Sequence, residues 1–196
     1  MFDWFFNFVD QAAQNFVIRL ILDHAQWVDW FAALFIVLGI LYGIQQGMMS
    51  EIAEILQIMI VIFLTFLFYE SIQVFIEVLF VKVHLAQKYY AGAAYILTGM
   101  SIWIVFGLIY KFIRKRFHTK AAKPLHYFGG AILGAFHLII IFSFLCQSIM
   151  LLPYRKAQAV FVDGSSFTGA YIIELAPKIY KMMAAPFELL IDQKKS

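Results

Sequence analysis

The segment from Tyr127 to Leu152 constrains the fold most, because its 26 residues include no Asp, Glu, Lys or Arg. A helix rises about 1.5 Å per residue, and roughly 20 apolar residues cross the hydrocarbon core of a bilayer. The segment is therefore long enough to span a membrane. The loop before it carries six cations: Lys111, Arg114, Lys115, Arg116, Lys120 and Lys123. This pairing of an apolar helix with a basic loop indicates an integral membrane protein.

The composition of the whole chain agrees with a membrane location. Its 196 residues are 63% hydrophobic and 14% charged, whereas soluble domains are about 45–50% apolar and about 25% charged. The net charge of +3 comes largely from one short loop, which is typical of a cytoplasmic membrane face rather than of nucleic-acid binding. Cys146 is the single cysteine. No Cys/His cluster has metal-ligand spacing, so we predict neither a metal site nor a cofactor.

Four spans are predicted, at residues 27–44, 52–69, 89–110 and 127–152. The last two contain no charged residue. The first two are shorter uncharged runs that reach the required length only when Asp29 and Glu54 are included. Runs of that length also occur in buried soluble helices, and the two uncharged neighbours favour the membrane here. The predicted fold class is all-α, a polytopic membrane helix bundle of about four transmembrane helices with amphipathic N- and C-terminal helices.

The remaining segments are expected to lie at the membrane surface or against the bundle. Residues 71–88 are too charged to cross and too apolar for water, which favours either an interfacial or a re-entrant helix. Residues 1–26 have helical apolar periodicity and no signal-peptide features, so we expect a retained amphipathic helix. Residues 154–196 form the predicted amphipathic tail, after the four-span domain of residues 27–153. Pro177 and Pro186 should each end or kink its helix, with a cap supplied by residues 163–166.

The basic residues also predict the orientation. By the bias of Lys and Arg toward the cytoplasm, loop 111–123 lies inside, which places the N-terminus and residues 71–88 outside. The same count places the C-terminus outside, but the tail is itself basic, and the side that it occupies stays open.

Five glycines recur at helical spacing on two predicted spans. Gly39, Gly43 and Gly47 follow one another every four residues, as do Gly130 and Gly134. In lipid, close backbone approach through small residues drives helix association. We interpret these glycines as helix-packing residues, in contact within one bundle or between subunits. The alternative is that glycine is simply common in membrane helices.

Four polar positions are candidates for function: Asp29, Glu51, His126 and His137. Glu51 and Glu54 stand near the start of the second span, where acids complement the helix dipole and can reach the basic loop. A proton or ion relay is the alternative, and His137 is the one ionisable partner that the third and fourth spans offer. The purely structural interpretation of His137 is that it forms a hydrogen bond to a neighbouring helix.

Two fragments have the outline of enzyme motifs without their context. His24 and Asp29 match an H-x4-D acyltransferase pattern, but two fixed positions occur often by chance and no basic substrate motif follows. Residues 164–169 miss the spacing of a serine nucleophile loop, and no strand precedes them. We therefore predict a protein that is not an enzyme.

The ordered motifs resemble the CvpA (colicin V production protein) family of bacterial inner-membrane proteins. Trp27-Val28-Asp29-Trp30 followed by residues 43–51 resembles the family's entry into the first span and its turn into the second. Residues 126–137 resemble its D-R-x-x-G-x-x-x-G-x-x-R-G signature, and residues 165–180 its tail more loosely. Three positions depart from the pattern, because Gln46, His126 and His137 stand where the family has a basic residue, Asp and Arg. The Asp–Arg pair of that signature is thus absent.

The resemblance implies a non-enzymatic inner-membrane accessory or scaffold factor for colicin V production or export and for envelope homeostasis. Its expected partners are the lipid bilayer and other membrane proteins or a second copy of the chain. An oligomeric channel or transporter subunit is the alternative, assembled through the glycine stripes.

Overall fold

A computed structural model describes residues 26–79, 89–114, 123–152, 155–162 and 166–193, and these are almost entirely α-helical. The helices are α3 (Trp27–Gln46), α4 (Met48–Leu79), α5 (Tyr90–Arg114), α6 (Lys123–Leu151), α7 (Arg155–Val162) and α8 (Gly169–Gln193). Four of them are long and apolar enough to cross a membrane, over Trp27–Gln46, Met48–Val78, Tyr90–Ile109 and His126–Leu151. The predicted all-α membrane bundle is confirmed. The predicted helix at residues 1–26 lies almost entirely outside the described residues.

The second helix is longer than the sequence indicated. Residues 71–79 continue α4 without a break, so no separate interfacial or re-entrant helix begins at Ser71. Between Met48 and Leu79 the chain has neither glycine nor proline to end a helix. Glu77 accepts a hydrogen bond from Gln73 at 3.0 Å, which pairs two polar side chains of this extension along the helix. Residues 80–88 lie outside the described part.

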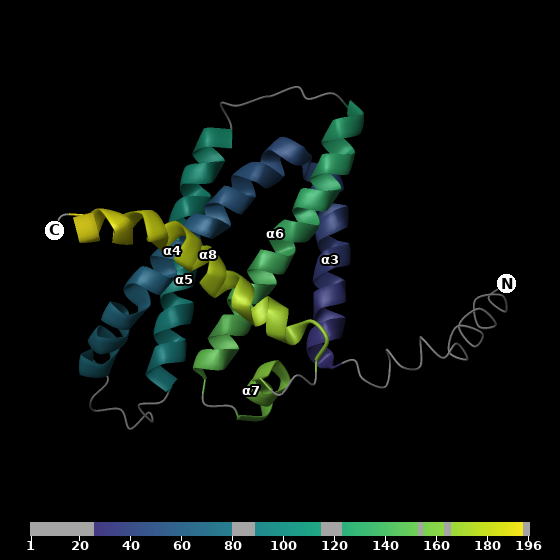
Figure 1. Ribbon diagram of the computed structural model, residues 1–196. Helices are drawn as coiled ribbons and strands as arrows, with labels where there is room; N and C mark the ends of the chain where they lie inside the picture. Colours follow the sequence, from purple (N-terminus) through teal and green to yellow (C-terminus); the bar gives the residue numbers. More distant parts are fainter. Residues whose placement is uncertain (1–25, 80–88, 115–122, 153–154, 163–165, 194–196) are drawn as a thin grey trace.

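In the tail, α8 runs through both of its prolines. Neither Pro177 nor Pro186 ends the helix. α8 lies across the bundle and contacts α6 and α4 (Figure 1). Its Ala176 and Ile179 enter the main core cluster, whose other buried members are Ile58, Val61, Ile62, Tyr95, Ile140 and Phe144. The tail is therefore part of the packed structure.

Helices α3 and α6 pack through the glycines that the sequence singled out. A Cβ on Gly43 would lie 2.7 Å from the carbonyl carbon of Gly130 and overlap its oxygen. A Cβ on Gly134 would overlap the oxygen of Gly39 and lie 2.8 Å from Gly43 Cα. Both stripes thus face each other within one chain. Backbone rather than flexible side chains fills the space, so no rotamer change can make room for a larger residue.

We predict that Gly43→Ala destabilises the bundle by about 1–3 kcal/mol, because the added methyl group overpacks a contact made of backbone atoms. Gly107→Ala is the matched control. The nearest atom to a Cβ there is Gln57 Nε2 at 3.8 Å, and alanine is the better helix former. Thermal unfolding in detergent, followed by circular dichroism, should show a lower midpoint for Gly43→Ala alone. Equal midpoints for the two variants would contradict the packing argument.

Candidate functional site

Asp29 caps two helices with one carboxylate. Its Oδ2 accepts a hydrogen bond from the backbone N–H of Gln26 at 2.9 Å, which closes the first turn of α3. Its Oδ1 accepts from the backbone N–H of Thr168 at 2.9 Å, from the Thr168 hydroxyl at 2.6 Å and from the Ser166 hydroxyl at 2.9 Å. The start of α3 is thereby fixed to the start of α8, 139 residues later in the chain.

The residues before α8 complete this cap. The Ser166 hydroxyl oxygen accepts a hydrogen bond from the N–H of Gly169 at 2.9 Å, and the same hydroxyl donates to Asp29 Oδ1. Two backbone donors in the entry to α8, which have no partner inside the helix, are thus satisfied by Ser166 and Asp29. The negative carboxylate also lies at the positive end of the α8 dipole. Both oxygens of Asp29 are therefore engaged in holding helices.

A second polar link fixes α8 further along. The hydroxyl of Ser143 in α6 donates to the carbonyl oxygen of Ile172 at 2.5 Å and accepts from the N–H of Ala176 at 2.9 Å. These two backbone groups are separated by one helical turn, so the hydroxyl bridges a donor and an acceptor of α8. Ser143 is fully buried. Together with Asp29, it anchors α8 at its start and over its first two turns.

His126 and Gly47 meet at the end of the bundle opposite to Asp29. Gly47 ends α3 with a φ of 82°, a left-handed value that favours glycine, and its N–H donates to Gly43 O at 2.8 Å. A Cβ on Gly47 would overlap the His126 ring. The Nδ1 atom of His126 is buried without a hydrogen-bond partner among the described residues. His126 thus packs over the turn between α3 and α4.

Glu51, Glu54 and His137 come together between α4 and α6. The Nδ1 atom of His137 lies 3.2 Å from Glu51 Oε2 and 3.6 Å from Glu54 Oε2. The exposed fractions of the three side chains are 0% for Glu51, 7% for His137 and 12% for Glu54. Glu54 Oε1 also accepts from the Ser50 hydroxyl at 3.4 Å. The structure pairs the acids with His137, where the sequence favoured helix-dipole and basic-loop contacts.

The outward face of α8 carries charge. Glu174 and Lys178 form an exposed ion pair at 2.6 Å, and Tyr171 and Lys181 are exposed beside them. The hydrogen bond from Lys178 lowers the pKa of Glu174, and the charge of Lys178 acts in the same direction. We call Tyr171, Glu174, Lys178 and Lys181 the α8 strip. It lies opposite to the buried Ile172, Ala176 and Ile179.

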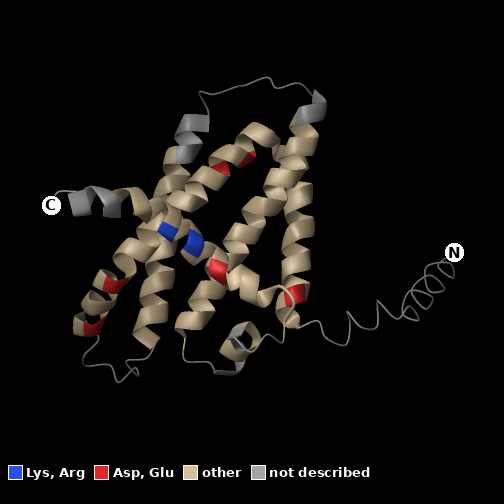
Figure 2. Cartoon of the chain, in the orientation of Figure 1, with Lys and Arg blue, Asp and Glu red and all other residues tan. Residues whose placement is uncertain are grey.

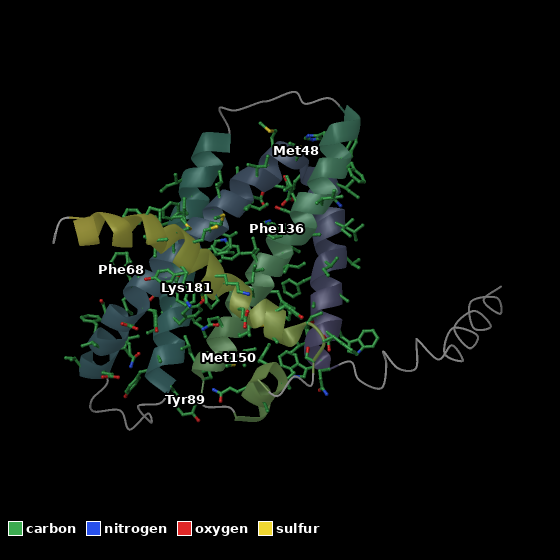
Figure 3. All side chains as sticks on the ribbon, in the orientation of Figure 1. Met48, Phe68, Tyr89, Phe136, Met150 and Lys181 are labelled. Atoms are coloured by element: carbon green, nitrogen blue, oxygen red, sulfur yellow. The ribbon has the colours of Figure 1, made fainter. Side chains whose placement is uncertain are left out.

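The α8 strip lies level with the middle of the spanning helices. Its buried neighbours Ala176 and Ile179 pack in one cluster with Ile62 of α4 and Ile140 of α6, each near the centre of its span. Figure 2 shows the two lysine positions of α8 between the ends of the bundle, and Figure 3 shows Lys181 between Met48 at one end and Tyr89 at the other.

The comparison with protein families agrees with these motifs. The model of the family described as "Colicin V production protein" matches residues 28–177. The chain belongs to this family. The match includes Asp29, the glycines, Glu51, His137 and the first turns of α8. Both partners of the Asp29 cap therefore lie inside the family domain, and the predicted resemblance is confirmed. No curated protein and no solved structure matches the chain.

Sequence reasoning did not identify Ser143 or Thr168. In the sequence, Ser143 is one polar residue within an apolar span, and nothing in the spacing shows that its hydroxyl faces a helix 29 residues away. The signal for Thr168 is local. A Ser-x-Thr-Gly sequence before an apolar helix is typical of a capped N-terminus. An Asp that faces the protein interior without a basic partner requires hydrogen-bond donors, which Ser and Thr hydroxyls and a free backbone N–H can supply.

We predict that Asp29→Ala loosens the start of α8 by about 1–3 kcal/mol, because three donors lose their acceptor. Asp29→Asn keeps one amide oxygen and should lose less. Hydrogen exchange of the backbone amides from 168 to 176 in detergent measures the effect. Glu70→Gln is the control, because Glu70 is exposed and, among the described residues, accepts only from Tyr69 at 3.2 Å. Unchanged protection in Asp29→Ala would show that the cap does not hold α8.

Proposed function

We propose that this protein is a non-enzymatic accessory factor of the bacterial inner membrane. It supports production or export of colicin V-type bacteriocins and envelope homeostasis by binding another membrane protein, or a second copy of itself, through the α8 strip. Family membership supports the proposed role in bacteriocin production. The position of α8 supports the proposal that the protein acts by binding a partner. The observation that carries the proposal is the exposed charge of α8 level with the middle of the spanning helices.

The cost of exposing charge to lipid is the physical reason. A charged side chain at the bilayer centre costs about 3 kcal/mol on insertion scales. Glu174 compensates Lys178 in part, whereas no ion pair to Lys181 is formed within the described residues. A face that carries these groups is stable beside a polar protein surface or water, and it is unstable beside acyl chains. α8 is therefore the face at which a partner covers the bundle.

In the proposed orientation, loop 111–123 lies in the cytoplasm. Asp29 and the start of α8 lie at the opposite end of the bundle, because α3 rises from Asp29 toward the Gly43 and Gly47 contacts with the start of α6. The α8 strip then begins near the outer surface and runs inward. A partner that reaches it would be another integral membrane component.

The alternative is an oligomeric channel or transporter subunit, favoured by the same strip, because charge at mid-depth also suits an aqueous pathway. The glycine stripes do not provide its subunit contacts in this arrangement, because they face each other within the chain. Copies would have to meet through α8 instead.

The test of the proposed function is complementation of a colicin V-secreting strain that lacks this gene. We expect the wild-type gene to restore secreted bacteriocin, and Lys178→Glu combined with Lys181→Glu to reduce it to the deletion level, because reversed charges repel the partner. Zones of growth inhibition from culture supernatants give the measurement. Glu70→Lys, a charge reversal on an exposed position outside α8, should complement fully.

A photo-crosslinking residue at position 181 should capture the partner in membranes, and one at Leu108, an exposed apolar residue of α5, should not. Full complementation by the double reversal would refute the α8 mechanism. Ion conductance by the purified protein in vesicles, lost in the double reversal, would instead establish the channel.

A further inference from the structure

We propose that Glu51, Glu54 and His137 form a binding site for one divalent transition-metal ion, of the Zn²⁺ or Mn²⁺ class, inside the bundle. The three side chains converge from two helices, with the acids on α4 and the imidazole on α6. Each offers one ligand atom, and these atoms lie within 4.8 Å of one another. This is the one such group of His, Cys, Asp and Glu within the described residues.

The two distances from the imidazole to the carboxylates fit a shared ion, and the two carboxylate oxygens lie within 4.8 Å of each other. Ligand atoms about 2.0–2.2 Å from a tetrahedral metal lie about 3.3–3.6 Å from each other. His137 Nδ1 lies 3.2 Å from Glu51 Oε2 and 3.6 Å from Glu54 Oε2. One imidazole with two carboxylates is a ligand set that suits Zn²⁺, Mn²⁺ or Fe²⁺. Mg²⁺ and Ca²⁺ fit less well, because they prefer oxygen ligands alone.

A second observation points to a ligand. The Oε1 atom of Glu51 is buried without any hydrogen-bond partner in the described chain, and the Glu51 side chain is 0% exposed. A buried carboxylate oxygen without a donor is unfavourable. Since the other oxygen of the same carboxylate is in the cluster, Oε1 lies within reach of an ion held there. Metal coordination would satisfy it.

The charge balance supports a dication. When both carboxylates are ionised, they place two negative charges between membrane helices, where an uncompensated charge is costly. A protonated His137 would neutralise one of them, whereas a divalent ion neutralises both and leaves the imidazole neutral as a ligand. Within the described residues, no lysine or arginine forms an ion pair with Glu51.

Burial makes this a structural site rather than a catalytic one. The ion would join the first turns of α4 to the middle of α6, three residues beyond Gly134, where α6 already packs on α3. It would therefore fix α4 relative to the α3–α6 pair. Water has little access, because Glu51 and His137 are almost fully buried.

Titration of tag-free, full-length protein in detergent with Co²⁺ tests the site, because Co²⁺ replaces Zn²⁺ and has a visible absorption band when bound to protein ligands. We expect one equivalent per chain, displaced by Zn²⁺ and followed by competition with Mn²⁺. Glu51→Gln and His137→Gln should each weaken binding by more than about tenfold, the range in which even residues that only support a ligand act. Glu77→Gln on the same helix should bind as the wild type.

Far-UV circular dichroism and gel filtration identify variants that fail to fold, and Glu54→Gln serves as a third ligand variant. Binding of well under one equivalent by folded wild-type protein would overturn the proposal and leave a cluster that holds only a proton. Undiminished binding by a folded Glu51→Gln or His137→Gln protein would also overturn it, because the metal would then lie elsewhere.

Discussion

The approach of the α3 and α6 backbones at their glycines is the contact on which the rest of this fold depends. Lipid tails are as apolar as leucine side chains, so burial of apolar surface gives little preference for one helix pairing over another. Shape decides instead. Where Gly43 meets Gly130, backbone atoms touch without side chains between them. That contact fixes the start of α6 beside the end of α3.

The other elements take their positions from this pair. Gly47 turns the chain directly after α3, in contact with the His126 ring. α4 therefore begins next to α6. As a result Glu51, one turn into α4, lies beside His137 of α6. At the other end, Asp29 emerges beside the chain that leads into α8. The α3–α6 pair thus determines where both polar clusters form.

Hydrogen bonds give these apolar helices their specificity. A leucine or phenylalanine surface tolerates small rotations, whereas a carboxylate that must satisfy four donors does not. Asp29 accepts from backbone donors that have no partner inside a helix, and Ser143 satisfies its own buried hydroxyl on the backbone of α8. Thr65 and Thr98, by contrast, donate to the carbonyls of Val61 and Ala94 in their own helices. They are satisfied locally and specify nothing about neighbours, although both are buried.

Sequence reasoning predicted the features that depend on neighbouring residues in the chain. It missed those that depend on how distant segments pack together. The uncharged runs predicted the spans because length and polarity alone decide whether a helix can cross hydrocarbon. The family was also evident from ordered glycines. The length of α4 was missed because the charges of residues 71–88 indicated a separate segment, although a helix can continue past the membrane surface. Of the two outcomes expected at Pro177, the end of the helix does not occur, because packing of Ala176 and Ile179 in the core outweighs the lost hydrogen bond.

The distribution of charge gives the bundle two unlike sides. On α3, the exposed residues Trp30, Leu34, Val37 and Leu41 are large and apolar, which suits direct contact with acyl chains. On α8, the exposed lysines lie level with the middle of the spanning helices. A single lipid environment cannot stabilise both faces, since the gain of burying leucine in hydrocarbon and the cost of burying lysine there have opposite signs. Glu51 and Glu54 of α4 avoid the conflict by turning inward to His137, whereas Glu174 of α8 faces outward. The exposed face of α3 thus suits contact with lipid, and the charged face of α8 suits a polar surface or water.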